Sequence, residues 1–343
     1  MGVSDAARDP EAVRSGLERW LRGQRDDTPD LRVGPLATPA QGLSSETYFL
    51  TVSAGGTTET LVARLPPVGG GLFPDYDLAL QARIQDAMAR HGIPVAAPIA
   101  YVDDLGWVGA PFLVMPRIEG LIPLDNPPFQ SEGWLHAATP EQQQVAFCGF
   151  LDVLADIHRL PDGGVAARAG GPGLAVELDW WTGYLEWAGQ GSVPQELRDS
   201  LTWCRNHLPD PEPPPSLLWG DVRLGNVIFG ADFLPAAVLD WEMASLAPAE
   251  VDLGWFFALR GRRPELPGFL DREAALARYS ERLGRPLGDL WWYELFALVR
   301  STAILVRMQR LLLQQGQPDH WLAGFDPIPK RIRSFLAGLA PEA

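Results

Sequence analysis

Cysteine is scarce in this sequence, and lysine is almost absent. Only Cys148 and Cys204 occur among the 343 residues, and Lys330 is the single lysine, so arginine supplies almost all of the basic charge. Both cysteines fall in segments with a helical pattern, so neither a disulfide framework nor a cysteine-based zinc site is expected. The histidines also lack metal-ligand spacing; they are His91, His136, His158, His207 and His320.

Positive charge is also in short supply, with 28 basic against 43 acidic residues and a net charge of -15. A nucleic-acid partner is therefore not expected, because such proteins carry a basic stripe. The acidic surface is mildly compatible with a cationic substrate, although solubility alone explains it.

The sequence has no long uninterrupted apolar run. Its N-terminus lacks the apolar segment of a signal peptide. The most apolar helix candidate, Leu290–Leu313, is interrupted by Glu294, Arg300 and Arg307, which favours a buried helix over a membrane span. These absences predict a soluble, cytoplasmic protein with no membrane partner.

The pattern of apolar and polar residues changes near Gly120. Before it, short β-prone runs and tight glycine turns predict antiparallel strands around one main helix, at 31–36, 47–52, 59–65, 75–91 (the helix), 94–102 and 111–115. After it, apolar periodicity predicts helices at 141–159, 180–188, 194–206, 250–260, 272–283, 290–315 and 329–339. The predicted fold class is α+β, with a small antiparallel β lobe followed by a larger helical lobe.

The chemistry is concentrated between Leu217 and Phe257. Two apolar, strand-like runs in this segment end at or just before Asp221 and Asp240, and Asn226 lies between them. Two carboxylates and a carboxamide beside strands form the oxygen ligand set that Mg²⁺ prefers when it also holds phosphate. An acid not needed by the metal can orient a hydroxyl as a base, so the pattern indicates phosphoryl transfer.

The run WGDVRLGNVIF, together with VLDWEMA and a later Asp-Leu-Gly, resembles the aminoglycoside phosphotransferase family. The similarity is closest to actinobacterial-type phosphotransferases and to the kinase domain attached to some acyl-CoA dehydrogenases. It runs from about Leu31 to the C-terminal helices and implies a two-lobed protein-kinase-like fold. The implied divisions are an N-terminal helix and linker (1–30), a nucleotide-binding lobe (31–118) and a helical lobe with the acceptor pocket (119–343).

The resemblance implies a role for each residue of the motif. Asp221 corresponds to the catalytic base, and Asn226 and Asp240 to the magnesium ligands that bridge the nucleotide phosphates. Arg223 either neutralises the transferring phosphate or forms a structural salt bridge. Asp252 corresponds to a structural aspartate that braces the catalytic loop.

The resemblance also implies a nucleotide site in the first lobe. Gly42, Ser44 and Ser45 occupy the phosphate-covering turn, where small residues let backbone N–H groups approach phosphate. Arg64 occupies the position of the phosphate-binding cation, and a guanidinium suits that role because it binds phosphate through two hydrogen bonds. The remaining nucleotide-site candidates are Ala63, Gln81, Met115, Arg117 and Ile118.

Three positions depart from the family pattern. Trp219 replaces the histidine that precedes Gly-Asp, Arg64 replaces lysine, and Gln81 occupies the place of the glutamate that pairs with that lysine. Asp75 or Asp77 could serve as that partner instead. These departures leave open a nucleotide-binding pseudokinase module without turnover.

The leading hypothesis is an enzyme that moves the γ-phosphate of ATP or GTP, with Mg²⁺, to a hydroxyl of a small-molecule acceptor. The alternative is a hydroxyacyl-CoA or hydroxyacid kinase. The predicted acceptor pocket is rich in aromatics and poor in acids, which favours a partly apolar alcohol over an aminoglycoside. Its candidate side chains are Asp179, Trp180, Trp181, Tyr184, Glu186, Trp187, Trp255, Trp291, Trp292, Tyr293 and Glu294. Either a monomer or a homodimer is expected.

Overall fold

The computed structural model describes residues 8–25, 28–39, 44–160, 171–260, 264–320, 322–324, 326 and 328–339. Its contacts divide the chain into two compact units. Unit 1 comprises residues 1–89 and 96–118, and unit 2 comprises residues 90–95 and 119–343.

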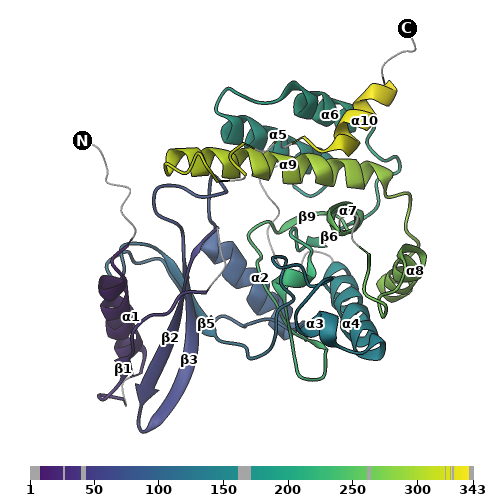
Figure 1. Ribbon diagram of the computed structural model, residues 1–343. Helices are drawn as coiled ribbons and strands as arrows, with labels where there is room; N and C mark the ends of the chain where they lie inside the picture. Colours follow the sequence, from purple (N-terminus) through teal and green to yellow (C-terminus); the bar gives the residue numbers. More distant parts are fainter. Residues whose placement is uncertain are drawn as a thin grey trace. The chain divides into compact units, whose positions relative to one another are not determined.

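Unit 1 is built on a five-stranded antiparallel sheet with the strand order β1-β2-β3-β5-β4 (Figure 1). Its strands are β1 (Arg32–Val33), β2 (Glu46–Ala54), β3 (Thr57–Leu65), β4 (Ala100–Val102) and β5 (Phe112–Pro116). The long β2–β3 hairpin turns at Gly55 and Gly56, both with positive φ, which glycine adopts without a steric penalty. Two helices complete the unit, α1 (Pro10–Gln24) and α2 (Leu78–Arg90).

The alternation of side chains along β3 sends neighbouring residues to opposite faces of the sheet. Ala63 lies on the face that packs against α1, in a core shared with Leu17 and Trp20. Val62 lies on the other face, packed against Leu113 and Met115. Arg64 shares the face of Val62 because it is two residues further along the strand.

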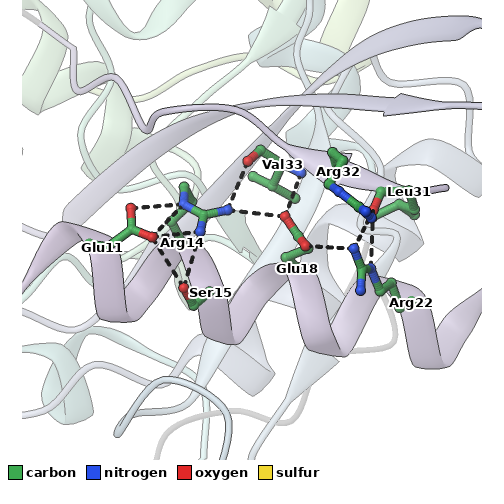
Figure 2. Close-up of polar contacts among 8 residues, drawn as sticks. All are labelled: Glu11, Arg14, Ser15, Glu18, Arg22, Leu31, Arg32 and Val33. Atoms are coloured by element: carbon green, nitrogen blue, oxygen red, sulfur yellow. Dashed lines mark hydrogen bonds and ion pairs between the residues drawn. The ribbon is translucent and has the colours of Figure 1, made fainter.

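Helix α1 covers the outer edge of the sheet at β1, as Figure 2 shows. Glu18 Oε2 accepts a hydrogen bond from Val33 N (2.9 Å), and Arg14 Nη1 donates to Val33 O (2.9 Å). Arg22 donates to Leu31 O from Nε and Nη2. The backbone groups of an edge strand are available for pairing with another chain, and here side chains of α1 satisfy them.

Unit 2 is mainly helical. Its helices are α3 (Trp134–Ala137), α4 (Pro140–His158), α5 (Leu174–Gly189), α6 (Gln195–Asn206), α7 (Glu250–Leu259), α8 (Arg272–Leu283), α9 (Trp291–Gln314) and α10 (Lys330–Leu339). Helices α7 and α9 approach closely where Gly254 meets Tyr293: a Cβ on Gly254 would lie 2.5 Å from the backbone carbon of Tyr293. No helix in the described ranges is long and apolar enough to cross a membrane.

Two short antiparallel strand pairs frame the segment that carries the acidic motif. β6 (Pro215–Leu218) pairs with β9 (Ser245–Pro248), and β7 (Val227–Phe229) pairs with β8 (Pro235–Val238). A 3₁₀ turn, η1 (Leu224–Asn226), leads directly into β7. The loops that follow β6 and β8 therefore both lie beside these two strand pairs in unit 2.

This architecture confirms the predicted α+β class, with an antiparallel sheet in unit 1 and mainly helices in unit 2. Two expected strands are shorter than predicted, and one strand was not predicted. The strand expected at 31–36 is reduced to β1 (Arg32–Val33). The strand expected at 94–102 is reduced to β4 (Ala100–Val102), since Pro94 and Pro98 have no N–H to donate to a ladder. β9 was missed because Ser245–Pro248 has no alternating pattern and is buried throughout. The domain boundaries at residues 30 and 118 stay predictions.

Candidate active site

The carboxylate of Asp221 is held by three side-chain donors. Its Oδ1 accepts from Trp255 Nε1 (3.0 Å). Its Oδ2 accepts from Arg223 Nε (2.9 Å) and from Asn226 Nδ2 (2.8 Å). The side chain is still 19% exposed, so its orientation is fixed while a solute can reach it.

The backbone at Gly220 brings the Asp221 loop against the loop that follows β8. Gly220 has a φ of +96°, and a Cβ there would lie 2.5 Å from both Cβ and O of Met243. A larger residue would therefore meet both a disfavoured backbone conformation and a steric clash. Glycine is thus required at position 220 by this close approach of the two loops.

Asp252, on α7, braces the same loop from a fully buried position. Its carboxylate accepts hydrogen bonds from Trp219 N (2.7 Å) and from Gly220 N (3.1 Å). It also contacts His158 Nε2 at 3.0 Å, and His158 Nδ1 in turn bonds the hydroxyl of Tyr279. Burial and the nearby Asp252 carboxylate raise the pKa of Tyr279 well above its usual value, which keeps the phenol neutral.

Asn226 connects the Asp221 loop to the loop that carries Asp240. Its backbone carbonyl accepts from Leu239 N (2.8 Å), directly before Asp240. Its side-chain nitrogen donates to both O and Oδ2 of Asp221. Because the oxygen and nitrogen of a carboxamide lie on opposite sides of its carbon, this leaves Asn226 Oδ1 directed away from Asp221.

The oxygen set around Asn226 fits a hard divalent cation. It comprises the amide oxygen of Asn226 and the carboxylate of Asp240, the donor types that Mg²⁺ binds beside phosphate, while Asp221 is the base candidate. Asp240 adopts a φ of +62°, an unusual conformation for a residue with a side chain and one often found at functional sites. Within the described ranges, no group of three His, Cys, Asp or Glu side chains is placed to hold a metal.

Arg223 is surrounded by carboxylates. Besides bonding Asp221, its Nη1 forms an ion pair with Asp125. Burial by itself would lower the pKa of Arg223, but the charges of Asp221, Asp125 and Asp240 outweigh it and raise that pKa. Asp125 could not be singled out from the sequence, because it lies 98 positions from its partner and belongs to no motif.

Trp219 bonds the second loop through its indole. Its Nε1 donates to Leu239 O (2.7 Å) and to Asp240 O (3.2 Å). The side chain is 1% exposed. The residue that departs most from the family motif therefore bridges the two loops.

In unit 1 the structure brings two of the predicted nucleotide-site residues together. Arg64 donates from Nε (3.3 Å) and Nη2 (2.9 Å) to Ser45 Oγ. Ala63 lies on the opposite face of the sheet, in the core shared with α1. Ser44 precedes β2, and Gly42 lies outside the described residues.

The other predicted nucleotide-site residues of unit 1 lie mainly on the sheet face of Arg64. Met115 and Ile118 belong to the small apolar cluster there, and Arg117 places its guanidinium 5.1 Å from the ring centroid of Phe49. Gln81 is buried on α2, and its Oε1 accepts no hydrogen bond within the described residues. Gln81 Oε1 is therefore not a hydrogen-bond partner of Arg64 in this structure.

The acidic residues predicted for the acceptor pocket are all paired with arginine. Asp179 bonds Arg205 and Glu186 bonds Arg198. Glu294 forms ion pairs with both Arg272 and Arg331. These contacts give the three carboxylates structural partners within unit 2.

Most of the aromatic candidates for that pocket are core residues. Trp181, Tyr184, Trp255, Trp292 and Tyr293 are each at most 6% exposed. Arg300 of α9 is 1% exposed and lies between Trp181 and Trp255, with its guanidinium carbon 4.8 and 4.9 Å from their rings. Of the buried aromatics, Trp255 bonds the base candidate Asp221 directly.

A comparison with known families matches residues 36–287 to the phosphotransferase enzyme family. That match spans well over half of the 343 residues. The chain belongs to this family. The matched residues include both acidic loops, those of Asp221 and Asp240.

Solved structures give the same fold. A candidate aminoglycoside phosphotransferase from Ralstonia eutropha JMP134 is 25% identical, with a TM-score of 0.67 and 90% of each chain covered. A macrolide 2′-phosphotransferase from Brachybacterium faecium is 20% identical, with a TM-score of 0.55, covering 92% of this chain and 98% of that one.

Curated relatives include acyl-CoA dehydrogenase family members. Human acyl-CoA dehydrogenase family member 11 is 27% identical over 219 residues, which cover 63% of this chain and 26% of that protein. Mouse family member 10 is 27% identical over 312 residues, covering 85% of this chain and 28% of that protein. The chain thus spans about a quarter of the length of the relatives it matches.

Proposed function

We propose that this protein transfers the γ-phosphate of ATP or GTP to a hydroxyl group of a small molecule. The observation that carries the proposal is the setting of Asp221, whose carboxylate is partly exposed and held by Trp255, Arg223 and Asn226. Proton acceptance from a hydroxyl needs a carboxylate that is oriented before the acceptor arrives.

In the proposed reaction, Asp221 accepts the proton of the acceptor hydroxyl as its oxygen bonds to the γ-phosphorus. The bond between that phosphorus and the bridging oxygen of the donor breaks, and the nucleoside diphosphate leaves. Arg223 has its pKa raised by the surrounding carboxylates and stays charged. Its role is to balance negative charge beside the transferring group.

Asn226 and Asp240 are the residues proposed to hold Mg²⁺. A bound Mg²⁺ would neutralise phosphate charge and orient the phosphate oxygens for transfer. Asn226 fits this role because its amide nitrogen is committed to Asp221, which leaves its oxygen for a cation.

Arg64 and Ser45 are proposed to contact donor phosphate, since the arginine already bonds the serine hydroxyl. Ser44 and Gly42 are proposed to line the same phosphate-covering turn. Met115, Arg117 and Ile118 remain candidates for the adenine side of the donor site. The buried Gln81 remains a polar candidate for the same site. On this face of the sheet Val62 is a better candidate than Ala63 for the apolar wall, because it shares the face of Arg64.

The test is an acceptor screen that measures release of nucleoside diphosphate. Aminoglycosides, amino alcohols, sugars and hydroxyacyl-CoA thioesters are tested in parallel with wild-type protein and with Asp221→Asn. Acceptor-dependent release by wild type alone is the expected result. Equal release by both proteins with every acceptor would refute the proposal.

A hydroxyacyl-CoA or hydroxyacid kinase is the second candidate. It is supported by the similarity to acyl-CoA dehydrogenase family members 10 and 11. The ion pairing of Asp179, Glu186 and Glu294 also favours an acceptor that is not polycationic, because those carboxylates already have cationic partners. In the same screen, this candidate requires turnover of hydroxyacyl thioesters or hydroxyacids and none of kanamycin-type sugars.

A further inference from the structure

The indole of Trp219 joins the two loops that the proposed reaction needs. Its own backbone nitrogen is fixed by the buried Asp252 carboxylate at 2.7 Å. Its side-chain nitrogen reaches 20 and 21 positions along the chain to the carbonyls of Leu239 and Asp240. One residue is therefore anchored at its backbone by α7 and bonded through its side chain to the backbone of the predicted metal ligand.

Asp240 needs such a restraint because of its backbone conformation. A φ of +62° is disfavoured for a residue with a Cβ, and it persists where surrounding contacts hold it. The bond from Trp219 Nε1 to Asp240 O and the bond from Leu239 N to Asn226 O restrain both ends of this Leu-Asp step. The first of these depends on an indole N–H.

We propose that Trp219 is a positioning residue that holds Asp240 in the conformation required to bind a divalent cation together with donor phosphate. This rests on the proposed function, since it gives Asp240 the metal. In this chain the tryptophan supports metal binding through its N–H, although it departs from the family motif.

Two variants remove the N–H of Trp219. Trp219→Phe removes the donor and part of the ring volume. Replacement of Trp219 by benzothienylalanine keeps two fused rings and removes only the N–H, so it serves where the phenylalanine variant does not fold. Trp292→Phe is the matched control, because Trp292 is 6% exposed and its Nε1 donates to one backbone carbonyl, that of Cys204 (3.0 Å), away from both loops.

The readout is calorimetric binding of a non-hydrolysable ATP analogue, with and without Mg²⁺, beside thermal unfolding and steady-state rates. We expect both Trp219 variants to weaken Mg²⁺-dependent binding at least five-fold and to raise the half-saturating Mg²⁺ concentration, while binding without Mg²⁺ changes less than two-fold. Trp292→Phe should lower the melting temperature comparably and leave Mg²⁺-dependent binding within two-fold of wild type.

Two results would overturn the inference. One is Mg²⁺-dependent binding unchanged in the benzothienylalanine protein. The other is an equal loss of that binding in Trp292→Phe, which would show general destabilisation. This outcome can be told apart from failure of the proposed function. If only the Trp219 changes weaken Mg²⁺-dependent binding, the inference is supported even when no acceptor is phosphorylated.

Discussion

The base candidate in unit 2 and the phosphate cation candidate in unit 1 are held in different ways. Asp221 has three side-chain donors around its carboxylate, and its loop is braced by the fully buried Asp252. Arg64 is half-buried and bonds the hydroxyl of Ser45, a group that rotates about a single bond. The base is therefore organised in advance by several donors, whereas the serine hydroxyl bonded to Arg64 can turn away when phosphate binds.

This difference predicts how each region responds to substitution. Changes around Asp221 should act on the chemical step, because they alter an orientation that already exists without substrate. Changes at Arg64 should act on donor affinity, because its phosphate contact forms only on binding. A split between kcat and KM therefore tests the comparison.

The largest effect is expected from Asp221→Asn. An amide cannot accept the hydroxyl proton, so kcat should fall by about 10³-fold, within the range for loss of a general base. Binding of the nucleotide with Mg²⁺ should persist within a few-fold. The melting temperature should fall less than for a fully buried carboxylate, because the Asp221 side chain is 19% exposed. Steady-state kinetics and calorimetry measure these quantities, and kcat above a tenth of the wild-type value would remove Asp221 from the base role.

Asp252→Asn should reduce both stability and turnover. Its two oxygens accept from Trp219 N, Gly220 N and His158, and an amide group would turn one acceptor into a donor facing other donors. We expect a loss of about 3 kcal/mol in unfolding free energy, as for breaking a buried charged network, and a drop in kcat at least ten-fold larger than any rise in donor KM. Urea unfolding and kinetics test this.

Asp152→Asn is the control for that experiment. Asp152 pairs with Arg278 between α4 and α8 near the surface, and such ion pairs contribute about 0–1 kcal/mol. A similar loss in both variants would show that Asp252 does no more than an ordinary ion pair.

The sequence predicted the α+β plan because its periodicities change clearly from strand to helix near Gly120. It also predicted that the loops of Asp221, Asn226 and Asp240 lie together, which the bonds of Asn226 to Asp221 and Leu239 show, while their roles stay predictions. It could not predict the contacts made across long separations. The bond from Trp255 to Asp221 and the ion pair from Arg223 to Asp125 span 34 and 98 positions, and no local pattern marks either partner.

The position of Ala63 on the sheet face opposite Arg64 has a simpler cause. Ala63 and Arg64 are adjacent on one strand, and adjacent strand residues point to opposite faces. The two-residue alternation of side chains along a strand therefore already excluded Ala63 and Arg64 from the same face of the sheet. On α5 and α9, Trp181, Tyr184 and Trp292 are buried, as aromatics at helical spacing commonly are.

Arg64→Ala should have an intermediate effect that falls on the donor. Loss of a charge-assisted contact to phosphate corresponds to about 1.5–3 kcal/mol, so the nucleotide KM should rise roughly ten- to a hundred-fold with a smaller change in kcat. Arg64→Lys should recover part of the affinity, because lysine keeps the charge but not the paired N–H groups. Arg83→Ala, at an exposed position on α2, is the control, and an unchanged KM in Arg64→Ala would exclude Arg64 from the donor site.

The smallest effect is expected at the edge of the unit 1 sheet, where Glu18→Gln should lower stability without changing kcat. Burial alone would raise the pKa of Glu18, but the hydrogen bond from Val33 N and the charges of Arg22 and Arg14 outweigh it and lower that pKa. The ionised form therefore stabilises the fold above the unfolded pKa of about 4.5, and this contribution is lost as the pH falls through the lower folded pKa. The glutamine variant should be about 1 kcal/mol less stable at pH 7, and its deficit should shrink below pH 4.5. A deficit that is independent of pH, measured by urea unfolding between pH 3 and 7, would show that packing and not ionisation gives Glu18 its effect.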